Sequence, residues 1–504
     1  MKNYDWIIVG TGAANLVSDA LIDAGFKIAI CEKAKFGGTC LTHGCIPSKI
    51  LSTCAASYLD MINADHCSIC LDKEAIKIDF QDLKRRLFNK IDESLGIADE
   101  YRDAGADVYP GCAEFLGPHE ICINYGDGRS AETISGDRIL VATGAKTRIP
   151  EIEGLTEASY LCPENFFDRD YPDPYPRSIA ILGSGVTACE FASIFNAFGS
   201  EVYLINRRPG LLRHLDREIC SSLEDQFNER GIQILSLGMP QKIESVDGLK
   251  RLHFDDGSTL EVEAIFVATG VVANADELHL DRAGIDRDQH GYIRTNEALE
   301  TSQPHIFALG DINGRMQLRH KANREAEILI HNLLENPQAP KRMDYSCIPS
   351  VVFTYPEVAS VGLSEEEAIK AYGSEAVICA RFDYSETAKG YAMGISAERA
   401  SQAFVKVVCL KENRKILGMH AIGAQASLLM QTYAYLMQAA VHPIAIIDPE
   451  LGASAAVQEV RSQKPNSPEY QLDYMEIFDE LLCAHPSLFE VAAWVSLGFE
   501  DEAE

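Results

Sequence analysis

The chain has 504 residues, enough for two to four domains, and its 46% hydrophobic content is sufficient for sizeable cores. Its 45 basic residues against 75 acidic ones give a net charge of −30, which argues against nucleic acid or an anionic membrane as a partner and favours a cytoplasmic protein. Fifteen cysteines, an odd number, behind an N-terminus without signal-peptide character predict reduced thiols, not a disulfide framework.

The first predicted strand, over residues 6–9, leads into a glycine-rich turn and then a helix. Gly10 and Gly12 lie in that turn, and Glu32 follows at the end of a second predicted strand, over residues 28–31. In a βαβ unit such glycines admit a pyrophosphate to the helix N-terminus, and the acid binds ribose hydroxyls. Asn15 stands where the pattern has its third glycine, so we expect the helix to pack differently there.

Residues 37–49 read Gly-Gly-Thr-Cys-Leu-Thr-His-Gly-Cys-Ile-Pro-Ser-Lys, with Cys40 and Cys45 separated by four residues. Pro47 suits the first turn of a helix, and a thiol at a helix start is favoured as the thiolate. Two cysteines at this spacing are on their own more often ordinary buried thiols. The flanking residues reverse that, because the whole segment resembles the redox-active segment of the class I pyridine nucleotide–disulfide oxidoreductases. That family includes dihydrolipoamide dehydrogenase, glutathione reductase, mycothione reductase and mercuric reductase.

Residues 50–105 read mostly as helix, with Leu83, Leu87, Ile91 and Leu95 at a spacing of four. The pair Cys67 and Cys70 invites a second redox or metal site. A zinc site needs four ligands, and no matching Cys/His pair follows, so we expect no metal.

The strand–glycine pattern then repeats. A predicted strand over 178–182 enters a turn with Gly183 and Gly185, and both halves end in Val-Ala-Thr-Gly, at Gly144 and at Gly270. Two such units predict two nucleotide-binding domains of related design. Two dinucleotide sites and a dithiol predict a flavin that passes electrons between a nicotinamide and a disulfide.

In the second unit the predicted strand over 202–205 is followed by Asn206, Arg207 and Arg208, without the ribose-binding acid. Arginines in that place suit a 2′-phosphate. Arg207 and Arg213 also have the spacing of glutathione reductase-like NADPH sites. We therefore predict NADPH, with NAD as the alternative; two solvated surface arginines are the other interpretation.

Further along, residues 301–311 resemble the family's second flavin motif, in which the aspartate, here Asp311, accepts hydrogen bonds from the ribityl chain. Residues 317–322, with Leu318 and His320, resemble the segment that lies along the flavin ring in dihydrolipoamide dehydrogenases.

From about residue 345 the sequence resembles the family's interface domain, with predicted strands over 404–408 and 416–420. Residues 442–478 then form a loop-rich insertion without a readable role. His485, followed by Pro486 and five positions on by Glu490, resembles the catalytic His–Glu pair of the family.

The resemblance implies roles for these residues. Cys45 would be the thiolate next to the flavin, and Cys40 the interchange thiol that attacks or releases substrate. Lys49 would pair with Glu190 near the flavin, and His485, oriented by Glu490, would act as acid/base on the substrate thiol. The cofactor-binding residues implied are Gly10, Gly12, Asn15, Glu32, Lys33, Gly38, Thr39, Lys49, Thr143, Gly144, Gly183, Gly185, Ala188, Arg207, Arg213, Gly270, Asp311, Leu318 and His320.

The implied fold is α/β, with two Rossmann-like three-layer domains for FAD and NAD(P) and a C-terminal α+β dimerisation domain. The expected division is 1–165 for the first part of the FAD domain, 166–275 for the NAD(P) domain, 276–344 for the return of the FAD domain and 345–504 for the dimerisation domain. In the family the interface domain pairs subunits, so we expect a homodimer whose active sites are shared between chains.

The expected activity is that of an FAD-dependent, dihydrolipoamide dehydrogenase-like oxidoreductase, which moves electrons between NAD(P)H, FAD, the Cys40–Cys45 disulfide and a small dithiol or disulfide. An NADPH-dependent reductase of mycothione or glutathione type is the alternative, supported by Asn15 and the two arginines. A redox-sensing flavoprotein without catalytic turnover is a more remote alternative.

Overall fold

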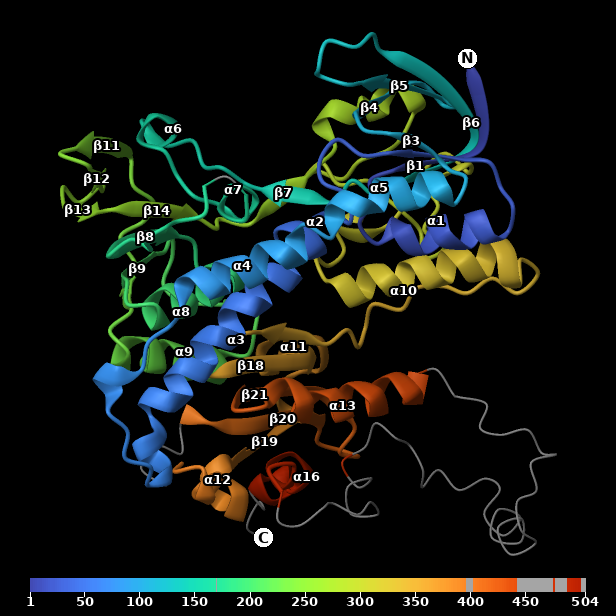
Figure 1. The fold of residues 1–504 in the computed structure, drawn as a ribbon. Helices are drawn as coiled ribbons and strands as arrows, with labels where there is room; N and C mark the ends of the chain where they lie inside the picture. Colours follow the sequence, from blue (N-terminus) through green and yellow to red (C-terminus); the bar gives the residue numbers. More distant parts are fainter. Residues whose placement is uncertain (169, 396–401, 442–474, 476–486, 500–504) are drawn as a thin grey trace, which may run out of the picture. The chain divides into compact units, whose positions relative to one another are not determined.

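A computed structural model describes residues 1–168, 170–395, 402–441, 475 and 487–499 (Figure 1). The chain divides into two compact units. Unit 1 comprises residues 1–61, 72–209 and 231–344, and unit 2 comprises 62–71, 210–230 and everything from 345 onward.

The larger sheet of unit 1 has the strand order β3-β2-β1-β6-β5-β4, with β16 added beside β6. Strands β1, β2, β3, β6 and β16 pair in parallel, while β4 and β5 form an antiparallel extension. Their bounds are Lys2–Val9 (β1), Ile28–Cys31 (β2), Asp107–Tyr109 (β3), Cys112–Gly117 (β4), Glu120–Asn124 (β5), Glu132–Val141 (β6) and Ile306–Ala308 (β16).

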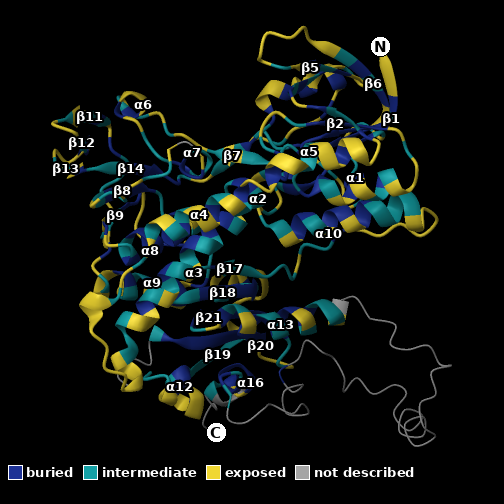
Figure 2. Ribbon diagram, in the orientation of Figure 1, coloured by how far each residue is buried: buried dark blue, intermediate teal, exposed yellow. Residues whose placement is uncertain are grey.

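This sheet is buried on both faces, as strand β1 shows (Figure 2). Trp6 and Ile8 enter a core with the helices α1 (Ala14–Asp23) and α10 (Arg319–Ile330). Ile7 and Val9 enter a second core with β4 and β5. Parallel strands covered on both faces read as continuous apolar runs, which is why residues 6–9 are recognisable in the sequence.

The second sheet of unit 1 is fully parallel, in the order β10-β9-β8-β14. An antiparallel sheet β11-β12-β13 and a two-stranded pair β7/β15 accompany it. The bounds are Ala145–Thr147 (β7), Ser178–Leu182 (β8), Glu201–Ile205 (β9), Gln233–Leu235 (β10), Lys242–Val246 (β11), Leu249–His253 (β12), Thr259–Val262 (β13), Ala264–Val267 (β14) and Val271–Ala273 (β15).

Most of the remaining helices of unit 1 connect strands of these sheets along the sequence. Helix α3 begins in unit 1 and ends at Ile62, the first residue of unit 2. The bounds are Gly38–Thr42 (α2), Cys45–Ile62 (α3), Phe80–Ile91 (α4), Ser94–Asp103 (α5), Leu155–Ala158 (α6), Pro163–Phe166 (α7) and Val186–Ala197 (α8), with short turns at Lys73–Ala75 (η2), Asp276–Leu278 (η3), Leu280–Ala283 (η4), Gly310–Asn313 (η5) and His331–Glu335 (η6).

Unit 2 contains a five-stranded antiparallel sheet in the order β17-β18-β21-β20-β19. Tyr433 of α13 packs in its core and donates a hydrogen bond to the carbonyl of Ala492 in α16, at 2.8 Å. The bounds are Ser350–Val352 (β17), Glu357–Gly362 (β18), Val377–Asp383 (β19), Phe404–Leu410 (β20), Ile416–Gly423 (β21), Arg217–Glu229 (α9), Glu365–Tyr372 (α11), Ala388–Ala392 (α12), Ala426–Val441 (α13), Glu490–Ala493 (α16), Ala64–Cys67 (η1), Ser374–Ala376 (η7), Tyr384–Glu386 (η8) and Val495–Gly498 (η10).

The predicted strands over 6–9, 28–31, 178–182, 202–205, 404–408 and 416–420 are confirmed. Residues 50–105 are mostly helical, as predicted. Leu83, Leu87 and Ile91 are buried in α4, which ends at Ile91, whereas Leu95, in the separate helix α5, is 67% exposed. A break between two helices removes the common face that a spacing of four assumes.

Candidate active site

The redox segment folds into two consecutive helix starts. Gly37, with φ +96°, precedes the short helix α2, which carries Cys40, and Cys45 is the first residue of α3. Both cysteines are free thiols; Cys40 is half-buried and Cys45 is exposed. The positive end of the α3 dipole therefore acts directly on Cys45.

The two thiols interact through a hydrogen bond between their sulfurs. This bond lowers the pKa of Cys40 to about 7, helped by the charge of Arg319 and the backbone N–H of Ile46, against the effect of burial. The same bond raises the pKa of Cys45. The two shifts belong to the pair and favour negative charge on Cys40, the thiol expected to meet substrate, whereas the family resemblance implies the thiolate at Cys45.

One turn along α3, Lys49 forms the predicted ion pair with Glu190 of α8. The Lys49 Nζ lies 2.8 Å from Glu190 Oε2, and Glu190 is 8% exposed. The pair is separated by 141 positions in the sequence, so the fold brings a fixed positive charge next to the dithiol helix. A lysine held in this way can stabilise negative charge on a neighbouring group.

The first glycine-rich turn leaves space that a dinucleotide needs. A Cβ on Gly10, at φ +98°, would lie 2.4 Å from the carbonyl oxygen of Ala142, whereas one on Gly12 would meet nothing within 4 Å. A Cβ on Gly38 would lie 2.5 Å from the Cα of Gly12. The turn, the end of β6 and the redox segment thus converge, and the backbone between them is open to a ligand.

Two polar groups beside this turn fit a bound dinucleotide. The Oε2 of Glu32 accepts from the N–H and hydroxyl of Thr11, at 3.0 and 2.9 Å, and Oε1 accepts from the N–H of Ala34 at 3.0 Å. Asn15, in the place of the third glycine, has a buried Oδ1 without a hydrogen-bond partner among the described residues. The open turn, the carboxylate and this acceptor together suit FAD.

The sequence analysis missed the buried ion pair Lys321–Glu325, which bonds to Gly310, the residue before Asp311. The Nζ of Lys321 donates to the Gly310 carbonyl at 3.1 Å and lies 3.2 Å from Glu325 Oε2. Glu325 in turn accepts from the N–H of Gly310 at 2.8 Å, and both side chains of the pair are fully buried. Burial raises the pKa of Asp311 itself. The only signal of the Lys321–Glu325 pair in the sequence is a lysine and a glutamate four positions apart on one helix.

A second missed residue, Glu277 in η3, pairs with the predicted Lys33. Glu277 forms an ion pair with the Lys33 ammonium, and its Oε2 also lies 3.6 Å from the Sγ of Cys112. The lysine next to Glu32 is therefore held by a residue 244 positions away, a contact that no local pattern could indicate.

The second glycine-rich turn repeats the construction of the first. A Cβ on Gly183, at φ +135°, would lie 2.2 Å from the carbonyl oxygen of Ala268, and Gly185 faces open space at the start of α8. Ala188 is buried in α8. The residues that follow one strand end also bond to the other strand end. The N–H of Asn274 donates to the Gly144 carbonyl at 3.0 Å, and the N–H of Arg148 donates to the Gly270 carbonyl at 2.8 Å.

Three arginines, Arg207, Arg208 and Arg213, follow β9 in the sequence. Asn206 is fully buried, and neither atom of its amide has a hydrogen-bond partner among the described residues. Arg207 and Arg208 are exposed and form no ion pair in the part of the chain that the structure describes. Arg213, which falls in unit 2, is likewise exposed and unpaired among those residues.

A groove of about 820 Å³ begins at Cys45 and follows α3. Its wall carries Lys49 and Tyr58 on α3, Lys77 before α4, and Arg86 within α4. Three of these side chains are cationic, and Asp79 and Asp82 in the same lining are acidic, so the charges along the groove nearly balance.

Comparisons with known proteins decide the family. A family model described as pyridine nucleotide-disulphide oxidoreductase matches residues 4–326, and the model of that family's dimerisation domain matches residues 348–463. The chain belongs to the pyridine nucleotide-disulphide oxidoreductases.

Similar members of this oxidoreductase family have several different substrates in their names. Mycothione reductase of Mycobacterium tuberculosis is 34% identical over 447 residues, 86% of this chain and 92% of the relative. Dihydrolipoyl dehydrogenase of Chlamydia trachomatis is 31% identical, covering 85% and 89%. Glutathione reductase of Burkholderia cepacia is 30% identical, covering 87% and 94%.

The solved structure of the HOCl-induced flavoprotein disulfide reductase RclA from Escherichia coli, in its Cu(II) complex, shares the fold. Its TM-score is 0.79 at 22% identity, and the match covers 99% of this chain and all of that one. The family and the α/β fold predicted from the redox segment and the two glycine-rich turns are thereby confirmed, and this oxidoreductase is an FAD-dependent enzyme that uses a pyridine nucleotide and a disulfide.

The remaining predicted site residues are placed as follows. Thr39, Thr143 and Leu318 lie in unit 1, and His320 is exposed at the start of α10. Glu490 is fully buried at the start of α16, while His485 and the insertion 442–478, apart from residue 475, lie outside the described residues. Cys67 and Cys70 are exposed, and no group of three or more possible metal ligands occurs in the described part of the chain. Nor does any described helix have the length and apolar character of a membrane span.

Proposed function

We propose that this enzyme uses NADPH to reduce the disulfide of a small thiol, of the mycothione or glutathione type. The observation that carries the proposal is the end of β9. Asn206 replaces the ribose-binding acid there, and Arg207 after it is exposed without an ion pair among the described residues. Unpaired arginines beside a glycine-rich turn are the groups that a 2′-phosphate requires, and an acid there would repel it.

Bound FAD supplies the exchange of two electrons between the nicotinamide and the Cys40–Cys45 disulfide. The first glycine-rich turn, Glu32 and Asp311 would hold it, and Lys49, fixed by Glu190, would stabilise negative charge beside it. These residues orient the cofactor and set the charge around it.

The chain's own thiols then carry out the exchange with substrate. The Cys40 thiolate attacks one sulfur of the substrate disulfide, so that a mixed disulfide forms and one substrate thiolate leaves. His485, oriented by Glu490, gives that thiolate a proton. Cys45 next attacks the sulfur of Cys40, its proton passes to the second leaving thiolate, and the Cys40–Cys45 disulfide is restored. The pKa of about 7 for Cys40 makes it the better nucleophile near neutral pH.

The active site is proposed to be shared between two chains. A dimerisation-domain model matches residues 348–463, and the dithiol lies near the N-terminus while His485 lies near the C-terminus. An isologous dimer would bring the His485 of one chain to the Cys40 of the other. The proposal also keeps the division 1–165, 166–275, 276–344 and 345–504 for the domains and a cytoplasmic location.

A heterodimer of one Cys45→Ser chain and one His485→Gln chain tests the shared site. If His485 acts on the other chain, one site carries both lesions and the second is intact, so about half of the wild-type activity is expected. If His485 acts within its own chain, both sites are damaged and the heterodimer is inactive, which would contradict the proposal.

Dihydrolipoamide oxidation with NAD is the second candidate. It is favoured by residues 317–322, whose Lys321 forms the buried pair with Glu325 under Asp311. Steady-state kinetics with lipoamide, mycothione disulfide and glutathione disulfide, each with NADPH and with NADH, separate the two. We expect a higher kcat/KM for NADPH with one of the two thiol disulfides; a preference for NADH with lipoamide would overturn the proposal.

A further inference from the structure

A buried ion pair of unit 1, Lys321 with Glu325, joins helix α10 to the short turn η5. Both side chains are fully buried, and the Lys321 Nζ lies 3.2 Å from Glu325 Oε2. The same Nζ donates to the Gly310 carbonyl at 3.1 Å and to Asn313 Oδ1 at 3.2 Å. The lysine thus binds the first and the last residue of η5.

Glu325 holds the same turn with its two carboxylate oxygens. Its Oε2 accepts the N–H of Gly310 at 2.8 Å, and its Oε1 accepts the side-chain amide of Asn313 at 2.7 Å. Gly310 has a φ of +79°, and a Cβ there would lie 3.8 Å from the Cβ of Ala322, so α10 packs directly against the start of the turn. Two charged side chains of one helix therefore fix η5 at both ends.

Asp311 lies between these two fixed ends. Its carboxylate forms no hydrogen bond or ion pair with any residue that the structure describes. Burial raises the pKa of Asp311, and the charge of Lys321 acts against that effect. Glu325 raises the pKa and Arg319 lowers it, both less strongly than Lys321 acts, and the phenol of Tyr292 also faces the carboxylate. Lys321 is thus the main charge that keeps Asp311 ionised.

An ionised carboxylate without a partner on the protein suits the ribityl chain of FAD. Its oxygens accept hydrogen bonds from several hydroxyl groups, whereas a protonated carboxyl group loses part of that capacity and the charge that strengthens the bonds. Asp311 also lies on a turn that is fixed at both ends, so little conformational entropy is lost when it binds. Its contact with FAD therefore depends on two properties, the charge of Asp311 and the position of η5.

We propose that Lys321 and Glu325 are positioning residues for FAD: together they hold η5 in place, and Lys321 keeps Asp311 charged as the acceptor for the ribityl hydroxyls. The inference rests on the proposed contact between Asp311 and the ribityl chain. It adds that a buried pair within α10 sets how firmly the flavin half of the cofactor is held, and how that affinity depends on pH.

Lys321→Met tests the inference, because methionine is also long and unbranched but carries no charge. FAD and ADP are each titrated into the apoenzyme, with flavin fluorescence and calorimetry as the readouts. ADP contains the adenosine and the pyrophosphate of FAD but lacks the ribityl chain. We expect the affinity for FAD to fall about tenfold and the affinity for ADP to stay unchanged. A general loss of the folded state would weaken both.

The pH dependence separates the charge from the fixed position. Because the ionised form of Asp311 binds FAD, the affinity falls as the pH drops through the pKa of Asp311. Lys321→Met raises that pKa, so the fall should begin at a higher pH than in the wild type. Glu325→Gln keeps an acceptor for Gly310 and removes a negative charge, so the fall should begin at a lower pH. A purely structural pair would give losses that are equal at every pH, which would overturn the role of the charge.

Lys321→Met leaves Glu325 buried without its partner, and such a change can prevent folding. The double variant Lys321→Met, Glu325→Gln removes both charges and is the substitute in that case. It should show a smaller shift to higher pH, since Lys321 acts on Asp311 more strongly than Glu325 does.

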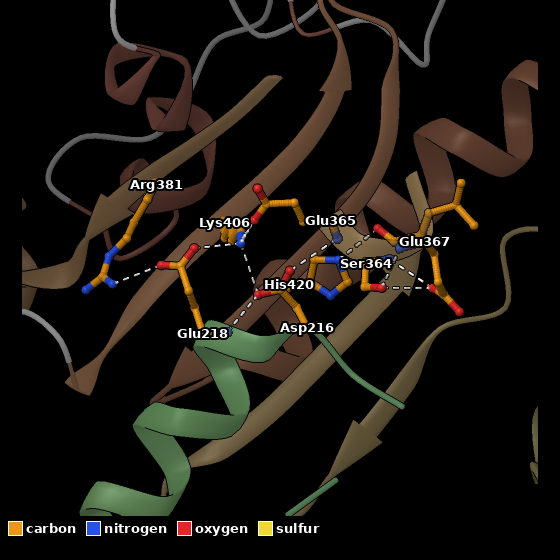
Figure 3. A network of polar contacts seen from close by, with 9 residues as sticks. Asp216, Glu218, Ser364, Glu365, Glu367, Arg381, Lys406 and His420 are labelled. Atoms are coloured by element: carbon orange, nitrogen blue, oxygen red, sulfur yellow. Dashed lines mark hydrogen bonds and ion pairs between the residues drawn. The ribbon is translucent and has the colours of Figure 1, made fainter. Parts of the chain in front are cut away.

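Lys406→Met is the matched control, because Lys406 of β20 is a buried lysine of unit 2 (Figure 3). Its side chain is 2% exposed, and its Nζ lies 3.2 Å from Asp216 Oδ1 and 2.6 Å from an oxygen each of Glu218 and Glu365. The residues proposed to hold FAD all belong to unit 1. Lys406→Met should therefore lower thermal stability and leave the ratio of FAD to ADP affinity unchanged. An equal change in that ratio would assign the effect of Lys321→Met to stability alone and overturn the inference.

Asp311→Ala separates this inference from the contact on which it rests. If Asp311→Ala leaves the affinity for FAD unchanged, the proposed contact with the ribityl chain fails, and the inference fails with it. If Asp311→Ala weakens FAD but Lys321→Met neither weakens it nor moves its pH dependence, the inference alone is overturned.

Discussion

The two glycine-rich turns of unit 1 share a backbone construction and differ in the residue that follows the next strand. In each turn the first glycine, Gly10 or Gly183, approaches a carbonyl oxygen so closely that a Cβ would lie 2.4 or 2.2 Å from it. In the first unit the neighbouring strand is followed by Glu32, whose carboxylate accepts three hydrogen bonds. In the second it is followed by Asn206, whose amide has no described partner.

The difference teaches where specificity resides. The glycines and carbonyls create room for any dinucleotide, because they are backbone features that exclude side chains. The residues after the strand decide which ribose is accepted: an acid suits free hydroxyls, and arginines suit a phosphate. One construction can therefore serve two cofactors in a single chain.

The largest expected effects come from filling the turns. Gly10→Ala should yield protein without FAD, and Gly183→Ala should keep FAD but lower kcat/KM for NADPH on the order of 100-fold, since each methyl meets a carbonyl at a positive φ. Flavin absorbance per protein and steady-state kinetics measure the two outcomes.

Gly25 and Gly199 provide the controls for these variants. Both have a positive φ, +81° and +92°, but a Cβ on either would meet nothing within 4 Å. Alanine there should lower stability slightly and leave cofactor binding intact. Equal kinetics for Gly183→Ala and Gly199→Ala would show that the close approach to Ala268 has no part in nucleotide binding.

Removal of Arg207 and Arg213 should remove the preference of the second nucleotide site for NADPH over NADH. We expect the double variant Arg207→Ala, Arg213→Ala to lose most of the preference for NADPH, about tenfold or more for each charge-assisted contact. Competition between NADPH and NADH in one assay measures this. Arg208→Ala is the control, and an equal loss from it would mean that only overall positive charge matters.

A smaller effect should follow when the second site is given the acid of the first. Asn206→Glu places a carboxylate after β9, so the ratio of kcat/KM for NADH to that for NADPH should rise about tenfold. Asn206→Leu, which removes the buried amide without adding charge, should keep the ratio and raise thermal stability, since both amide atoms lack described partners. A rise in the NADH ratio with leucine would point to packing as the cause.

The smallest effect is expected at the first site. Glu32→Gln keeps an acceptor for Thr11 but loses the charge, so FAD should bind about three- to tenfold more weakly, with the NADPH preference intact. Reconstitution of the apoenzyme with FAD, followed by fluorescence, gives the affinity. An unchanged affinity would assign Glu32 to folding of the turn alone.

Local patterns in the sequence were sufficient for features whose physics is local. Gly10, Gly12 and Glu32 fall within one βαβ unit, and Cys40 and Cys45 fall within one segment. Lys49 and Glu190 required the family resemblance, because their 2.8 Å contact joins residues 141 positions apart in the sequence. Residues 50–105 are mostly helical as predicted, but apolar spacing alone does not show that one helix ends at Ile91 and the next begins at Ser94.

The features that sequence reasoning missed are long-range electrostatic contacts. The pairs Lys33–Glu277 and Lys406–Asp216 join residues 244 and 190 positions apart. A charged residue in a sequence is expected at the surface by default, and only the fold shows which few are buried with a partner. Lys321 and Glu325 are close in sequence, yet nothing local distinguishes them from a solvated pair on a helix.

The contact between Gly38 and Gly12 has a consequence for how this chain can change over generations. A side chain at Gly38 would press on the backbone of the cofactor turn, 2.5 Å from the Cα of Gly12. Every residue has that Cα, so a change at Gly12 would make no room for a side chain at Gly38. Lineages of this enzyme should therefore retain a glycine at position 38 whichever residue stands at position 12, even though 25 residues of sequence separate the two.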